Sequence, residues 1–137
     1  MLSPLQIVNK MLNNDSMSQW LGIKLVSVEK GNVTVKMIVR EEMTNGFKIA
    51  HGGITYSLSD SSLAFSANSY GIQAVSIETS ISHLKPVHVG DVLTTCVEEI
   101  SVTKKIGVYH IKVVNQNSHL VSTMKGTMYK TGTEWTL

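Results

Sequence analysis

The chain has 137 residues, the length of one compact domain, and no second domain of ordinary size fits beside it. Hydrophobic residues make up 42% and charged residues only 16%, which excludes a disordered or fibrous protein and leaves more surface than usual for another subunit to cover. The net charge is only +2 and no basic run exceeds Lys104-Lys105, which argues against a nucleic-acid-binding groove or a polybasic membrane patch.

Nothing in the sequence predicts export or a membrane span. The first residues lack the long apolar core of a signal peptide, and no stretch approaches the roughly 18 apolar residues of a membrane helix. The single cysteine, Cys96, lies among strand-forming residues, so we expect a buried free thiol in a reducing compartment. These features predict a cytoplasmic protein that does not bind membranes or nucleic acid.

The elements at the start of the chain are a helix and then a hairpin. Apolar residues at helical spacing predict a short amphipathic helix over 4–11 within a helical segment 1–20, and Asn13-Asn14-Asp15 ends it. From Ile23 the apolar period becomes two, which predicts two strands joined by a turn at Lys30-Gly31-Asn32.

The rest of the chain predicts one long helix followed by four strands. The helix spans 54–69, a segment rich in Ser, Ala and Leu that follows Gly52-Gly53. The strands are expected at 74–84, 92–102, 106–115 and 120–130, and their short connections favour antiparallel neighbours. Six strands and one long helix predict a single α+β domain over 1–137, in which a curved antiparallel sheet wraps around the helix.

Asp60 is the only formally charged residue between Ile49 and Ile77, and it falls in the middle of this helix. A lone aspartate on a helix is ordinarily a solvent-facing position, but an outer face would carry more than one charge over four turns. We therefore favour a functional carboxylate. No Lys or Arg lies three or four residues away, where the neighbours are Tyr56, Ser57, Leu63 and Ala64.

The residues just before the helix offer backbone donors. Gly52-Gly53 lets the backbone approach a ligand closely, and it places free N–H groups at the positive end of the helix dipole, as in an oxyanion hole. Alternatively, the two glycines only form the turn into the helix. His51 is either a base or, as we favour, a hydrogen-bond donor that stabilises this turn.

Gly52 and Asp60 are eight residues apart, about 12 Å along a helix, so they are too far apart to touch the same carbonyl group. A two-fold dimer with antiparallel helices would bring Asp60 of one subunit towards Gly52 of the other. The spacing therefore predicts a homodimer with two shared sites.

The segment 45–69, with the sequence NGFKIAHGGITYSLSDSSLAFSANS, resembles the HGG and downstream Asp signature of hotdog-fold acyl-CoA thioesterases of the phenylacetate-degradation (PaaI-like) type. The segments 21–35 and 75–91 are similar to that family's opening strands, third strand and following turn. The resemblance implies the hotdog fold and hydrolysis of an acyl-CoA, with no cofactor beyond the CoA of the substrate. It also implies a homodimer that assembles into a tetramer.

The resemblance assigns the central roles to four residues. Asp60 is implied to be the catalytic carboxylate, as nucleophile or as general base on water. The Gly52 N–H is implied to polarise the thioester carbonyl, Asn45 to orient water or substrate, and His51 to lie beside the oxyanion hole.

Further candidates are less central. Ser76 matches a hydroxyl residue that assists the attacking water in relatives, and Ser61 stands where the family has Thr. We also expect Gly53 and Tyr56 to contact substrate. For Tyr56, a position in the hydrophobic core is an equally good interpretation. Lys85, at a strand end, is a candidate for the CoA phosphates or an ordinary solvated lysine.

Thioester hydrolysis also fits the residues without the resemblance, because one carboxylate and oxyanion donors suffice for a good leaving group. The five histidines lack metal-ligand spacing and no G-x-S-x-G motif is present. The main alternative is a non-catalytic hotdog module that binds acyl-CoA, and Asp60 argues against it because simple binding needs no carboxylate. A hotdog dehydratase is disfavoured, since its His-first motif and downstream helix Glu are absent.

Overall fold

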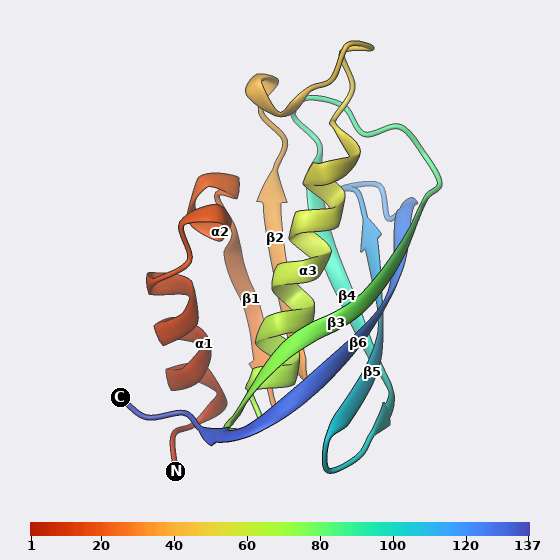
Figure 1. Ribbon diagram of the computed structural model, residues 1–137. Coiled ribbons are helices and arrows are strands. Elements are labelled where there is room, and N and C mark those ends of the chain that lie inside the picture. The colour runs from red at the N-terminus through yellow and green to blue at the C-terminus, as the bar shows by residue number, and fades with distance from the viewer.

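Six antiparallel strands form one curved sheet in the computed structural model, which describes residues 1–137 (Figure 1). The order across the sheet is β1-β2-β4-β5-β6-β3, so β1 and β3 are the edges. The long β6 continues past the predicted end at 130, and its last residue pairs with the start of β3. The strands are β1 (Lys24–Glu29), β2 (Asn32–Ile38), β3 (Ile72–His83), β4 (Val92–Val102), β5 (Ile106–Val114) and β6 (Leu120–Glu134).

The helix α3 (Gly52–Asn68) lies in the concave face of this sheet, as predicted (Figure 1). Leu58 and Phe65 pack into a core with β2 and the N-terminal helices, and Leu63 packs into a second core with β5 and β6. The helix begins two residues earlier than predicted because His51 caps it. The predicted α+β architecture is confirmed.

Serines on α3 replace missing strand partners of β2. β2 pairs with β4 only over Lys36–Ile38, which leaves the backbone of Val33 without a strand on that side. Ser66 Oγ accepts a hydrogen bond from the Val33 N–H at 2.9 Å, and Ser62 Oγ donates to the Val33 carbonyl at 2.7 Å. Buried backbone groups require such partners, so the serine-rich composition of α3 fixes the helix against the sheet.

Two short helices, α1 (Pro4–Asn13) and α2 (Ser16–Leu21), replace the single predicted N-terminal helix. Ser3 caps α1, and Asp15 caps α2 by accepting from the Ser18 N–H at 2.9 Å. α2 ends at Gly22, whose φ of +74° suits glycine. Both helices lie beside α3 (Figure 1).

None of the helices has the length and apolar character that a membrane span requires.

Cys96 is exposed, so the prediction of a buried thiol is wrong. Its neighbours Thr95 and Val97 are buried, because side chains alternate between the two faces of β4 and Cys96 falls on the outer one.

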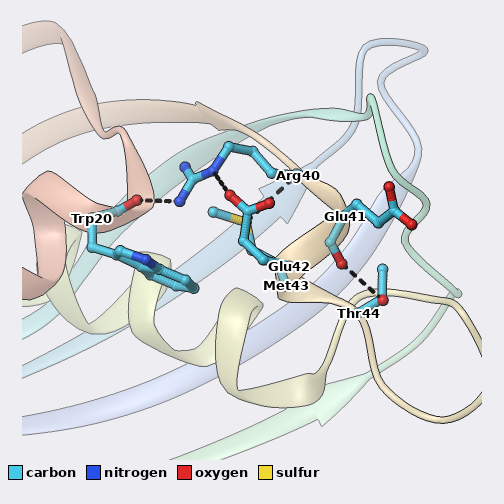
Figure 2. Close-up of polar contacts among 6 residues, drawn as sticks. All are labelled: Trp20, Arg40, Glu41, Glu42, Met43 and Thr44. Carbon is cyan, nitrogen blue, oxygen red and sulfur yellow. Dashed lines mark hydrogen bonds and ion pairs between the residues drawn. The ribbon is translucent and has the colours of Figure 1, made fainter.

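Arg40 connects the loop between β2 and α3 to Trp20 of α2 (Figure 2). Its guanidinium donates to the Trp20 carbonyl at 2.6 Å, pairs with Glu42 at 2.5 Å and lies 5.0 Å from the centre of the Trp20 ring. The short 3-10 helix η1 (Glu41–Met43) follows, and Thr44 Oγ1 donates to the Glu41 carbonyl at 2.9 Å. These contacts tie the loop to the end of α2.

Candidate active site

The start of α3 leaves one backbone donor free. His51 Nδ1 accepts a hydrogen bond from the Gly53 N–H at 2.8 Å, and the His51 carbonyl accepts from the Ile54 N–H at 2.9 Å. The Gly52 N–H has no partner in the chain and sits at the positive end of the helix dipole. This N–H is therefore available to bind a ligand oxygen.

His51 has the structural role favoured from the sequence, but as an acceptor rather than a donor. A neutral imidazole whose Nδ1 accepts a hydrogen bond carries its proton on Nε2. Because Gly53 gives its N–H to this ring, Gly53 has no backbone N–H left for a substrate, unlike Gly52.

Asn45 lies at the base of a tight loop that faces the start of α3. Its N–H donates to the Ile49 carbonyl at 2.8 Å, and its Oδ1 accepts from the Phe47 N–H at 2.9 Å. The side-chain oxygen is thus used within the loop, which leaves the amide NH₂ group as the part of Asn45 that can donate to water or substrate.

A pocket of about 400 Å³ opens between this loop, the start of α3 and the segment after β3. It brings together three predicted residues, Asn45, Gly52 and Lys85. Ile49, Ala50, Pro86, Val87 and Val121 are among the apolar residues that line it. The pocket thus combines an apolar lining with polar residues and the free Gly52 N–H, as small-molecule sites do.

His83 and Thr55 also line the pocket, and neither is predicted from the sequence as a site residue. His83 Nδ1 lies 3.2 Å from Thr55 Oγ1, which also donates to the Gly52 carbonyl at 3.2 Å. A Cβ at position 52 would come within 3.2 Å of His83 Nε2, so glycine leaves room for the imidazole. No local pattern marks His83, because only the sheet order brings the end of β3 to the start of α3.

Asp60 lies two turns further along α3 and does not line the pocket. Its carboxylate makes no hydrogen bond within the chain and is partly buried. Burial raises the pKa of Asp60, and the negative charge of Asp15 raises it further. An unpaired carboxylate with a perturbed pKa is typical of a functional group.

Three predicted residues also lie away from the pocket. The Tyr56 hydroxyl is 2.6 Å from Thr79 Oγ1, and its ring packs against the second core. Ser61 Oγ is 2.8 Å from Ser18 Oγ of α2. Ser76 is exposed on the edge strand β3, where the pairing register shifts after it.

Comparison with known proteins identifies relatives of the whole chain. The model of the thioesterase superfamily matches residues 47–122. The acyl-coenzyme A thioesterase PaaI of Escherichia coli (strain K12) is 35% identical over 127 residues, which cover 93% of this chain and 91% of that protein.

Solved structures agree with this fold. The structure of Escherichia coli PaaI, from the phenylacetic acid degradation operon, matches with a TM-score of 0.94 and 34% identity over 97% of this chain and 96% of that one. A hypothetical thioesterase with coenzyme A from Streptococcus pneumoniae TIGR4 matches with a TM-score of 0.85 and 27% identity over 92% of this chain and 98% of that one. The predicted resemblance to PaaI-like proteins and the hotdog fold are thus confirmed, and the chain belongs to the thioesterase superfamily.

Proposed function

We propose that this thioester hydrolase cleaves acyl-CoA to a free acid and CoA. The observation that carries the proposal is the unpartnered Gly52 N–H beside the pocket at the start of α3. A thioester carbonyl bound there would place its oxygen against this N–H, and the helix dipole would stabilise the negative charge that develops on the oxygen. The CoA bound to the Streptococcus pneumoniae relative supports the substrate class.

Asp60 supplies the carboxylate in this proposal, either as the nucleophile or as the general base on water. Its carboxylate is free of donors within the chain, so no internal ion pair must be broken before it reacts. The raised pKa makes the ionised form a stronger base. No cofactor beyond the CoA of the substrate is needed, because the thiolate is a good leaving group.

The two groups meet across a homodimer. The least buried face of α3 carries the small residues Gly53, Ser57 and Ala64 around Asp60, which would let a second helix approach closely. The edge of β3 beside it has no strand partner and exposes Val75 and Ile77. An unpaired strand edge with exposed apolar side chains favours pairing with another copy. Assembly of such dimers into a tetramer is part of the same proposal.

Supporting residues then act from both subunits. In this proposal the Asn45 amide orients water or the acyl group, His51 lies beside the oxyanion donor as the cap of α3, and Lys85 of the pocket lining binds a CoA phosphate. Ser76 lies on the strand edge that would face the partner, where its hydroxyl can assist the attacking water.

A panel of aryl-, short- and long-chain acyl-CoAs tests this function, with released CoA followed by a thiol reagent. The exposed Cys96 would react with the reagent, so Cys96→Ser provides the background. We expect hydrolysis that falls by at least about 10²-fold in Asp60→Asn. The control Glu98→Gln removes a carboxylate from the outer face of β4 and should retain the rate. Binding of acyl-CoA without hydrolysis would instead identify a non-catalytic binding module.

A further inference from the structure

Three side chains connect the start of α2 to the middle of α3. Asp15 Oδ2 accepts a hydrogen bond from the Ser18 hydroxyl at 2.5 Å, and Ser18 Oγ lies 2.8 Å from Ser61 Oγ. Ser18 is fully buried. A hydroxyl has one hydrogen, and that of Ser18 is given to Asp15, so Ser61 must donate its own hydrogen to Ser18. The hydrogen bonds are therefore donated in one direction, from Ser61 to Ser18 and from Ser18 to Asp15.

This hydrogen-bonded relay of Ser61, Ser18 and Asp15 ends directly beside Asp60, because Ser61 is the next residue on α3. Fixing the Ser61 side chain fixes the turn of α3 that carries the carboxylate. The proton of Ser61 is committed to the relay, which leaves this hydroxyl only acceptor capacity towards a ligand. Asp15, the N-cap residue of α2, is thus linked by hydrogen bonds to the residue that follows Asp60.

Asp15 is also the charged group that acts on Asp60. From α1, Lys10 donates to the Thr136 carbonyl and lies near the Trp135 ring. From the sheet, His83 packs on Gly52 at the start of α3, and Glu99 bonds to Tyr70 beyond the end of α3. None of these groups offsets the repulsion between the two aspartates.

We propose that Asp15 is a positioning residue for the catalytic carboxylate: through Ser18 and Ser61 it holds the turn of α3 that carries Asp60. This inference rests on the proposed function. A carboxylate that binds a proton more tightly is a better base once ionised, but it is lost to protonation at a higher pH. The negative charge of Asp15 adds to burial, the larger cause of the raised pKa of Asp60, so Asp15 contributes both to the strength of the base and to the acid limit of the activity.

Two substitutions separate the charge from the relay. Asp15→Asn removes the charge, and asparagine caps a helix as well as aspartate does, so the fold is retained. We expect the acid limb of the kcat/KM profile to move to lower pH and the plateau to fall. Ser18→Ala cuts the relay and keeps the charge, so we expect kcat to fall roughly two- to tenfold with the acid limb in place. Asp91→Asn, which also removes a carboxylate that accepts a backbone N–H, is the matched control and should leave the limb in place.

A measurement without substrate distinguishes this inference from the function on which it rests. The chain has only three aspartates, so a sample labelled with ¹³C-aspartate gives three side-chain carboxyl signals, and Asp60→Asn assigns one of them. We expect Asp15→Asn, or Asp15→Ser as a second neutral cap, to lower the pH at which Asp60 titrates. An unchanged Asp60 titration in a folded Asp15 variant would overturn the inference. Absence of hydrolysis by the wild type would overturn the proposed function alone.

Discussion

Mixing two inactive variants should restore activity if the site is shared between subunits. Gly52 and Asp60 are the first and ninth residues of one unbroken helix, so they are separated by about 12 Å along its axis. A thioester carbonyl held at Gly52 cannot be reached at that distance by Asp60 of the same chain. It can be reached by the partner's carboxylate if the two helices are antiparallel.

The expected recovery follows from the two-fold symmetry. One parent carries Asp60→Asn, and the other carries Asn45→Ala with Gly52→Ala, which keeps the backbone N–H but adds a Cβ 3.2 Å from His83 Nε2 that crowds the pocket beside it. In a mixed dimer one site joins the intact Asp60 to the intact Gly52 of the other chain, and the second site holds all the substitutions. Random exchange of equal amounts makes about half of the dimers mixed, each with one working site of two, so activity should return to roughly a quarter of the wild-type value.

The assay is acyl-CoA hydrolysis before and after exchange, with differently tagged chains weighed by mass spectrometry to prove that mixed dimers form. Each parent mixed with itself is the control. Proven exchange without recovered hydrolysis would show that both groups act within one chain, and the distance argument would be wrong.

Four further outcomes are expected. Asn45→Ala should lower kcat/KM roughly 10- to 1,000-fold, the scale of one lost positioning contact, and unchanged kinetics would remove this residue from the site. Because the pKa of Asp60 is raised above its ordinary 3.8, the folded protein loses stability as the pH rises from 3.8 through the raised pKa. Asn at position 60 does not titrate, so the Tm of Asp60→Asn minus that of the wild type should increase over this pH range and stay constant above it. Gly126→Ala would place a Cβ 2.4 Å from a methyl carbon of the buried Leu63, so urea unfolding should show a loss of about 1–3 kcal/mol, and wild-type stability would contradict the close packing. Ser59→Ala removes a fully buried hydroxyl without a partner, so the same measurement should show no loss or a gain of up to about 1 kcal/mol.

The features predicted correctly from the sequence depend on local patterns. Alternating apolar residues mark all six strands, and β4 begins and ends at the predicted residues. The Ser-, Ala- and Leu-rich composition after Gly52-Gly53 marks α3, the helix that the sheet covers. Local periodicity marks strands such as β2, β4 and β5, whose side chains alternate between buried and exposed, whereas α3 lacks an apolar period because most of its circumference is buried.

The features that were missed depend on tertiary structure or on very short elements. α2 has six residues, fewer than two turns, so its apolar period is not visible. His83 joins the pocket only because β3 pairs with β6 at the edge of the sheet and ends beside α3. Cys96 shows a related limit: a residue type that favours burial does not decide which face of a strand it occupies.

The two ends of the proposed site are built by different parts of the chain. The Gly52 end is held by the loop before α3 and by the end of β3, mostly within the segment 47–122 that matches the superfamily model. The Asp60 end is held from outside that segment, by Asp15 and Ser18. The oxyanion end thus belongs to the shared domain, whereas at the other end the N-terminal helices contribute the charge of Asp15, which adds to burial in raising the pKa of Asp60. Changes in those helices would therefore alter the pH range of the enzyme and leave its oxyanion donor in place.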